Sequence, residues 1–481
     1  MLVAARARAA HLLSIGVPLL AIVLWTEPAH AYAWMIRHGY GGCITCHVDP
    51  SGGELLTPYG RVQSDLLLRM HYGKDTTSAS ASSTSSGGDF NSFDSFDSFE
   101  SDESEKKDKG ADTDEDKGAD EEKGADEEKG ADEEKGADGD KEKPKAEAEA
   151  APAEADSGVP AKSSGFLWGL FEPPDWLLLG GAFRLASTLK NSEYSVFPMQ
   201  ADLWGQIQIG VFRANATIGV SKVGVGSPHA RAAQVTTNQG DEYNLLSRVH
   251  WLGVDIAGGK YTLRAGRMNL PYGVRIPEHT MWVREATQTD RESDQQHGVA
   301  LAYNGDLFRG EIMAIAGNYQ VNPDAYRERG GSMYIEGLLT EDFALGVSAL
   351  ATNAKADRIT LDQEDTVRQD YGVMARSAPV EQLVILFEAD VLLRSRRESG
   401  YVGFLQADME FIQGLHFMLT GEALDNGSID GQPRAKGFGE PRFGGWISAD
   451  WFFLPHMEVR VDAIIRQQDP FTLLSQIHVF L

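Results

Sequence analysis

The sequence predicts an all-β transmembrane barrel of about 16 antiparallel strands, preceded by a small α-type segment and a disordered acidic linker. Three observations favour this fold class. From about residue 166 onward, segments of roughly ten residues alternate between apolar and polar side chains, as in strands between lipid and a lumen. The connections alternate between short turns and long polar loops, which is typical of outer-membrane barrels. After residue 31, no apolar run approaches the ~20 residues of a membrane helix.

The first 31 residues have the pattern of a secretory signal peptide. Arg6 and Arg8 form a basic region, residues 12–25 are an apolar run, and Ala29-His30-Ala31 resembles a cleavage site. We therefore expect the rest of the chain to be exported from the cytoplasm.

Residues 32–73 form the predicted α-type segment, and they contain the two cysteines of the chain. Cys43, Cys46 and His47 form the pattern C-x-x-C-H, which is typical of covalent haem c. The two thiols bond to the haem vinyl groups, and the adjacent histidine is the proximal iron ligand. A Cys43–Cys46 disulfide would leave His47 unexplained, a thioredoxin-like pair needs a βαβ context, and zinc needs further ligands. We expect one haem c held by Cys43, Cys46 and His47.

The sixth position of the iron has several candidate ligands. Met70 and His71 lie far enough after the motif to reach the other face of the haem, and this pair is the preferred prediction. His38 is less suited because it lies close before His47, and Met35 is a further candidate. An open position, or a ligand from outside the segment, remains an alternative.

Residues 74–164 are predicted to be a disordered linker. A Ser/Thr run is followed by Phe-Asp-Ser triplets and by a repeat of Lys-Gly-Ala-Asp-Glu-Glu. Each repeat contains a glycine, which costs a helix about 1 kcal/mol, and no apolar face compensates. The chain carries a formal net charge of -27 with no basic stripe, which argues against a nucleic-acid partner.

The predicted barrel spans residues 165–481. The strands are expected at 177–187, 199–210, 212–222, 244–256, 259–268, 296–304, 307–317, 330–339, 343–353, 369–376, 381–394, 400–412, 414–424, 441–453, 456–467 and 472–481. Short turns, such as 304–306 and 378–380, alternate with long loops, so both barrel ends belong on the periplasmic side. A soluble β-sandwich is the alternative, but it favours strands nearer ~5–6 residues.

The polar faces of these strands are expected to line a lumen. The candidate lumen residues are Asp390, Asp408, Glu410, Glu422, Asp450, Glu458, Asp462, Arg394, Arg442, Arg460 and Arg466. They could favour cations or form salt bridges across the barrel. By analogy with 16-strand porins, the long connection 269–295 could fold inward and narrow the lumen. An ordinary surface loop is the preferred interpretation, and a lumenal plug or a contact with the haem segment are the alternatives.

The order of signal peptide, single C-x-x-C-H and barrel resembles the fused outer-membrane monohaem cytochrome–porins, a family that includes bacterial iron oxidases. Locally the resemblance rests on Arg37, the haem motif, Leu56 and Tyr59-Gly60-Arg61. It implies electron transfer between an extracellular donor, such as Fe(II), and periplasmic carriers. The chain departs from the family in its long linker, which leaves the haem free to sit in the barrel, beneath it, or to shuttle.

Three functions compete at this stage. The first is an electron conduit in the outer membrane, with lipid and periplasmic carriers as partners. The second is a porin for solute passage with a tethered periplasmic cytochrome. The third is a peroxidase-like enzyme, for which the sequence offers little beyond Arg37 and His38.

Overall fold

A computed structural model describes most of two regions of the chain. The described residues are 33, 35–38, 40, 42–50, 52–53, 55–70, 166–222, 243–278, 280–291, 293–358 and 363–481. They belong to one compact unit. The expected signal peptide at 1–31 and linker at 74–164 lie outside the described residues.

The described chain is dominated by antiparallel strands. In chain order these are β1 Leu177–Lys190, β2 Glu193–Ile209, β3 Phe212–Lys222, β4 Tyr243–Leu246, β5 His250–Ile256, β6 Tyr261–Met268, β7 Gln296–Asn304, β8 Phe308–Gly317, β9 Arg329–Thr340, β10 Phe343–Ala354, β11 Thr366–Val380, β12 Leu383–Arg394, β13 Gly400–Ile412, β14 Leu415–Asp425, β15 Ala435–Lys436, β16 Gly439–Glu440, β17 Arg442–Leu454, β18 Met457–Arg466 and β19 Thr472–Phe480. β15 and β16 form a small separate ladder within the connection between β14 and β17.

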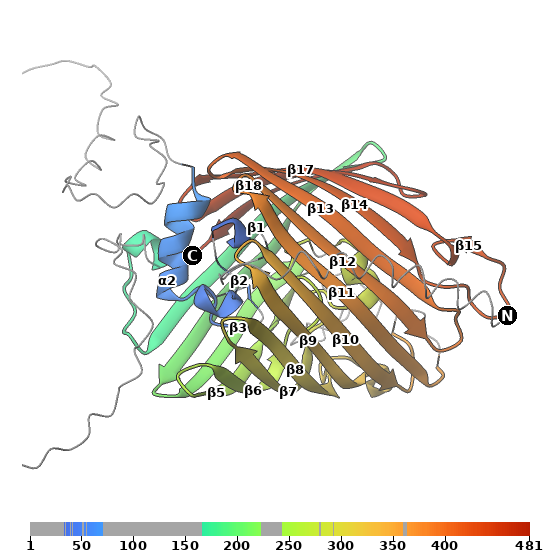
Figure 1. The fold of residues 1–481 in the computed structure, drawn as a ribbon, viewed down its shortest axis with the longest axis horizontal. Coiled ribbons are helices and arrows are strands. Elements are labelled where there is room, and N and C mark those ends of the chain that lie inside the picture. Colours follow the sequence, from blue (N-terminus) through green and yellow to red (C-terminus); the bar gives the residue numbers. More distant parts are fainter. Residues whose placement is uncertain are drawn as a thin grey trace, which may run out of the picture. The chain divides into compact units, whose positions relative to one another are not determined.

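The remaining seventeen segments form one sheet that closes on itself (Figure 1). β1 pairs with β2 along one edge and with β19 along the other, with Phe183 opposite Val479. β4 and β5 both pair with β3, so they are two halves of one barrel strand, and the barrel has sixteen strands. Closure satisfies the backbone groups of both edge strands. The predicted antiparallel barrel of about 16 strands is confirmed.

Several strand boundaries differ from the prediction; β2, for example, begins at Glu193 rather than at 199. The expected strand 244–256 is interrupted at 247–249, although the Thr217 amide still donates to the Val249 carbonyl at 2.8 Å. The expected turn at 378–380 is wrong, because β11 continues to Val380 and the turn lies at 381–382. Pro379 has no N–H to donate, and the β11–β12 register shifts between Ser377 and Val380.

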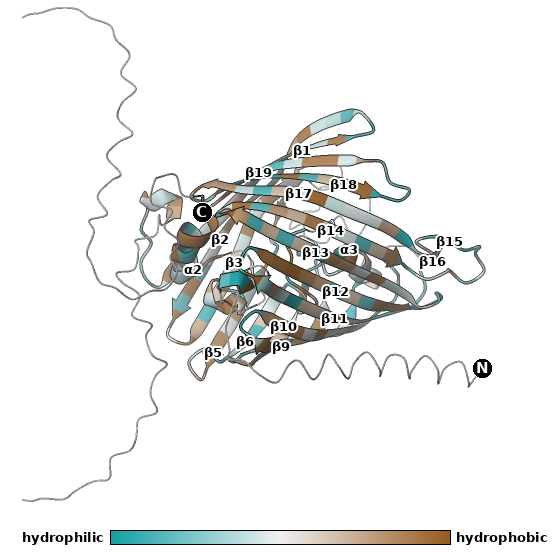
Figure 2. Ribbon diagram, turned by 45° about the horizontal axis from the view of Figure 1, so that its top comes forward, coloured by the Kyte–Doolittle hydropathy of each residue, from teal (hydrophilic) through white to brown (hydrophobic). Residues whose placement is uncertain are grey.

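The two faces of the barrel wall differ in chemistry, and Figure 2 shows hydrophobic and hydrophilic residues alternating along the strands. Outward side chains such as Leu203, Leu252 and Leu419 are 57%, 68% and 63% exposed. Inward carboxylates such as Glu388 and Asp408 are fully buried. An apolar exterior on a closed antiparallel barrel is the arrangement of outer-membrane proteins, and this chain is an outer-membrane β-barrel. Within the described residues, no helix is long and apolar enough to cross a membrane.

The helical segments are short and do not form part of the barrel wall. They are η1 Met35–His38, η2 Cys43–Thr45, α2 Pro58–Gln63, η3 Ser64–Leu68, η4 Phe166–Gly169, α3 Trp282–Thr287 and η5 Asp324–Tyr326. The first four belong to residues 33–70, which we call the N-terminal segment. α3 belongs to residues 269–295, which we call the inward loop.

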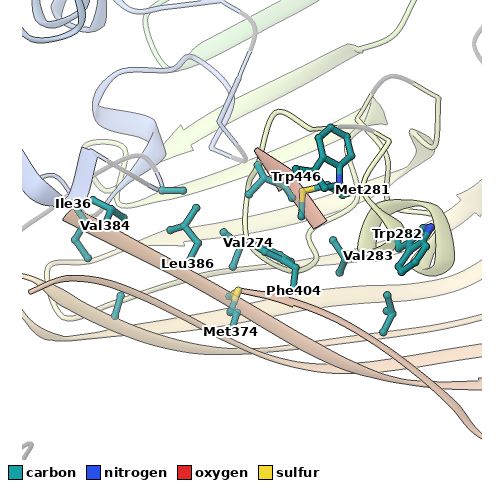
Figure 3. Close-up of a cluster of buried hydrophobic side chains, with 14 of the residues drawn as sticks. Ile36, Val274, Met281, Trp282, Val283, Met374, Val384, Leu386, Phe404 and Trp446 are labelled. Carbon is teal, nitrogen blue, oxygen red and sulfur yellow. The ribbon is translucent and has the colours of Figure 1, made fainter. Parts of the chain in front are cut away.

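The barrel interior contains an apolar cluster that joins these parts (Figure 3). Ile36 comes from the N-terminal segment, and Val274, Met281 and Trp282 come from the inward loop. The wall contributes Met374, Val384, Leu386, Phe404 and Trp446. These inward apolar side chains interrupt the polar faces expected from sequence because they pack against protein rather than water.

The apolar side chains on the outer face of the barrel are expected to contact lipid, and this can be tested at Leu419. Leu419 lies midway along β14 and is 63% exposed, so Leu419→Arg places a charge near the lipid midplane. We expect a loss of about 2–4 kcal/mol in the free energy of unfolding, measured by urea titration in lipid vesicles. Gln432→Arg, in the exposed connection after β14, is the matched control and should change little. Equal effects of both variants would contradict the lipid-facing assignment.

Candidate functional site

The C-x-x-C-H sequence forms a single tight turn. The His47 and Cys46 amides donate to the Cys43 carbonyl at 2.8 and 3.2 Å, so the three residues follow one helical turn. Cys43 and Cys46 are not joined in a disulfide. Gly52, at φ +76°, passes beside Cys43, and an added Cβ there would lie 3.0 Å from its Sγ. The Cys43 thiol lies 3.6 Å from Arg309 Nη1 of β8 and is not part of the cavity lining that Cys46 and His47 share.

Helix α2 packs directly on this turn. Thr57 caps the helix by accepting from the Gly60 amide at 3.0 Å, and Pro58 occupies the first helical position. The Thr57 amide donates to the Cys46 carbonyl at 2.9 Å, and its hydroxyl donates to the Thr45 carbonyl at 3.1 Å. A Cβ on Gly60 would lie 2.1 Å from the Cys46 carbonyl oxygen, so this contact requires glycine.

His47 is buried and held by the following loop. Its Nδ1 lies 3.1 Å from the Gly53 carbonyl oxygen, which accepts a hydrogen bond when Nδ1 carries the proton. Burial, together with the nearby Arg291 guanidinium, lowers the pKa of His47 to about 4. The imidazole is therefore neutral near pH 7, and this tautomer has its lone pair on Nε2. Burial, with a smaller contribution from Cys43, raises the pKa of Cys46 to about 11.

Cys46 and His47 line a cavity between the N-terminal segment and the barrel wall. The cavity has an empty volume of about 1390 Å³, part of it open to solvent. Met35, Leu56 and Leu68 line it from the N-terminal segment. The barrel and inward loop contribute Arg184, Trp204, Pro277, Glu278, Thr280, Trp446, Asp450, Phe452, Glu458, Arg460, Asp462, Leu474, Gln476, His478, Phe480 and Leu481. The lining therefore combines aromatic and aliphatic side chains with arginines and carboxylates.

Of the residues proposed from sequence as distal ligands, Met70 and His38 lie outside the cavity lining. The Met70 amide donates to the Phe452 carbonyl at 2.8 Å. Burial lowers the pKa of His38 despite the opposing charge of Glu410. His71 lies outside the described residues, so the assignment to the Met70/His71 pair stays a prediction. Met35, a weaker candidate, does line the cavity.

Sequence reasoning missed His478, which lines the same cavity from β19. The period-two pattern places it on the polar face of the last strand. Nothing in the sequence indicates that this strand faces the haem motif.

The N-terminal segment is held in the barrel by buried ion pairs. The Arg37 guanidinium donates to Glu410 at 2.9 Å and also to Asp408, and the Arg37 side chain is 1% exposed. Asp49 pairs with Arg264 on β6 at 2.7 Å. Arg61 donates to the Leu179 carbonyl of β1. Asp408 and Glu410, expected from sequence to face a lumen, thus bind the segment.

The inward loop enters the barrel, so the preferred interpretation of 269–295 as an ordinary surface loop is wrong and the inward fold suggested by analogy is the one observed. The Tyr272 hydroxyl donates to Asp390 at 2.9 Å, and the Trp282 amide donates to Glu422 at 2.8 Å. Arg460 donates to Glu278 at 2.8 Å. Near the segment, Arg291 of the loop donates to the Gly52 carbonyl. His279 of the loop lies outside the described residues.

The inward loop and the N-terminal segment therefore both pack against the inner face of the barrel wall. Among the described residues, no group of three or more His, Cys, Asp or Glu side chains is arranged to hold a metal ion by itself. A porphyrin site would depend instead on the motif and the cavity.

Fold and interior together define a porin-like outer-membrane β-barrel with an N-terminal helical segment. The chain is similar to a loop-deletion mutant of the outer membrane protein OmpT of Vibrio cholerae, with a TM-score of 0.47 and 10% identity over 63% of this chain and 99% of that one. It is similar to Salmonella typhi OmpF in complex with daunomycin, with a TM-score of 0.47 and 13% identity over 63% and 97%.

A third similar structure is the outer membrane channel DcaP of Acinetobacter baumannii, with a TM-score of 0.44 and 12% identity over 65% and 99% of the two chains. No protein-family model and no curated protein matches this sequence.

Proposed function

We propose that this chain is an outer-membrane electron-transfer protein that carries one covalent haem c. Cys43 and Cys46 would supply the two thioether bonds and His47 the proximal ligand. The observation that carries this proposal is the position of Cys46 and His47, which line a cavity between the N-terminal segment and the barrel wall.

The residues around the cavity suit a haem. His47 is neutral, and the contact of its Nδ1 with the Gly53 carbonyl favours Nε2 as the ligating atom. Leu56, Phe452 and Phe480 offer apolar surface to a porphyrin. Arg184 and Arg460 line the same cavity and offer positive charge to its propionates.

When bound, such a group would supply one-electron chemistry: an extracellular donor would lose one electron, with Fe(II) becoming Fe(III), and a periplasmic carrier would accept it. The protein's part would be to hold the group between the N-terminal segment and the barrel wall. Fe(II) as donor follows from the resemblance to the fused cytochrome–porins. The N-terminal segment and the inward loop both bind inside the barrel, which favours this function over solute passage through a wide pore.

The test uses full-length protein in lipid vesicles that contain ferricyanide. Fe(II) is added outside, and the loss of ferricyanide colour is followed. We expect reduction of the trapped ferricyanide, and a haem band that survives denaturing electrophoresis. Cys43→Ala/Cys46→Ala should lose both. Gly42→Ala is the control because its Cβ would meet nothing closer than Thr45 Oγ1 at 3.7 Å.

Two outcomes would overturn the proposal. If no covalent haem is present in the wild-type protein, the cofactor assignment is wrong. If haem is present but ferricyanide stays oxidised while vesicles swell in sugar solutions, the protein is a porin with an attached cytochrome.

A further inference from the structure

His478 faces the candidate haem cavity from the opposite end of the sequence. It lies on β19, where its register partners are Glu458 on β18 and Arg184 on β1. All three side chains line the cavity with Cys46 and His47. The strand that closes the barrel therefore brings an imidazole to the same space as the haem motif.

We propose that His478 is the sixth ligand of the haem iron, supplied by the barrel wall. This inference rests on the proposed function. The side chains that commonly ligate haem iron are histidine, methionine, cysteine and tyrosine. Among the described residues that line the cavity from the barrel and the inward loop, His478 alone belongs to this set.

Glu458 orients the His478 ring. His478 Nδ1 lies 3.2 Å from Glu458 Oε2, so the carboxylate accepts the Nδ1 proton when the imidazole is neutral. That tautomer presents the lone pair on Nε2, which is the ligating atom in carboxylate–histidine–metal arrangements. The ring of Phe480, with its centroid 5.3 Å away, packs beside the imidazole. The His478 side chain is only 12% exposed, so its orientation is held by protein.

Within the described cavity lining, the competing ligand from the N-terminal segment is Met35. The two ligands differ in a measurable way. Two histidines give ferric iron a low-spin spectrum without the sulfur-to-iron charge-transfer band of a methionine ligand. Methionine also raises the reduction potential relative to histidine.

The test is electron paramagnetic resonance and near-infrared spectroscopy on purified, oxidised full-length protein. We expect a low-spin bis-histidine signal in the wild type. His478→Ala should convert most of the iron to the high-spin form, and added imidazole should restore the low-spin signal. His478→Met should introduce the sulfur-to-iron band and raise the midpoint potential. His297→Ala, in a barrel histidine outside the cavity lining, is the matched control and should leave the spectrum unchanged.

Failure of this inference can be distinguished from failure of the proposed function. If covalent haem is absent from the wild type, the proposed function itself fails. If haem is present and His478→Ala keeps the wild-type low-spin spectrum, His478 is not the ligand. Loss of the low-spin signal in Met35→Ala alone would then identify Met35. Each variant is also run on electrophoresis with and without heating, because a closed barrel migrates differently before it is unfolded by heat. Rescue by imidazole shows that an open coordination position, not misfolding, explains the high-spin form.

Discussion

Arg37→Ala is expected to release the N-terminal segment from the barrel. The substitution leaves Asp408 and Glu410 buried without the guanidinium that pairs with both. Removing one partner of a buried ion pair costs about 3–5 kcal/mol, because the remaining charge is left uncompensated. A loss of that size raises the population of the detached segment by at least about 100-fold. The measurement is the rate of trypsin cleavage after Arg61, whose side chain is buried while the segment is docked.

Arg434→Ala is the matched control for this prediction. Arg434 pairs with Glu398 at 2.8 Å, but the two side chains are 62% and 55% exposed, so little change is expected. The triple variant Arg37→Ala/Asp408→Asn/Glu410→Gln should recover part of the loss because it removes the unpaired charges. Equal cleavage rates in wild type and Arg37→Ala would show that this ion pair does not hold the segment.

Trp282→Ala is expected to loosen the inward loop. Trp282 is 1% exposed and lies under two guanidinium groups, with the ring centroid 4.4 Å from Arg442 and 4.8 Å from Arg466. Truncation of a buried tryptophan costs about 3–5 kcal/mol. We expect hydrogen exchange of the amides in α3 to accelerate by at least about 100-fold, as measured by mass spectrometry. In planar bilayers, the variant should open more often than the wild type.

Trp176→Ala removes the same type of side chain from a site that is 51% exposed, and it is the control. In Trp176→Ala, the amides of α3 should exchange hydrogen at the wild-type rate. Unchanged exchange in Trp282→Ala would mean that the hydrogen bonds of the loop to Glu388 and Glu422 hold it without the aromatic contact.

The sequence predicted the barrel well because each strand carries its own evidence. Alternation within β12, with Phe387 outward and Glu388 inward, depends on neighbouring residues alone. A turn is expected at 378–380 because proline is usually confined to strand edges, strand starts and bulges. In the structure, β11 continues past Pro379, and its register with β12 shifts there. The composition of residues 247–249 does not distinguish them from strand residues, so the sequence does not predict the break between β4 and β5.

Long-range contacts explain what the sequence could not predict. Val384 and Leu386 are apolar and yet face inward, because they belong to the same buried cluster as Ile36 and Val274. The role of Asp408 and Glu410 depends on Arg37, which lies at the other end of the chain. In the same way, the motif residues could be named from their spacing, but His478 could not be connected to them by any local pattern.

The pairing of β1 with β19 has a consequence for assembly. Arg184 comes from β1, and His478 and Phe480 come from β19, so one wall of the cavity forms only when these two strands join. An assembly intermediate with an open β1–β19 edge has the C-x-x-C-H turn but lacks that wall. If His478 ligates a haem iron as proposed, the spectrum of the iron would report maturation of the barrel, because six-coordinate haem would mark molecules in which the cylinder is complete.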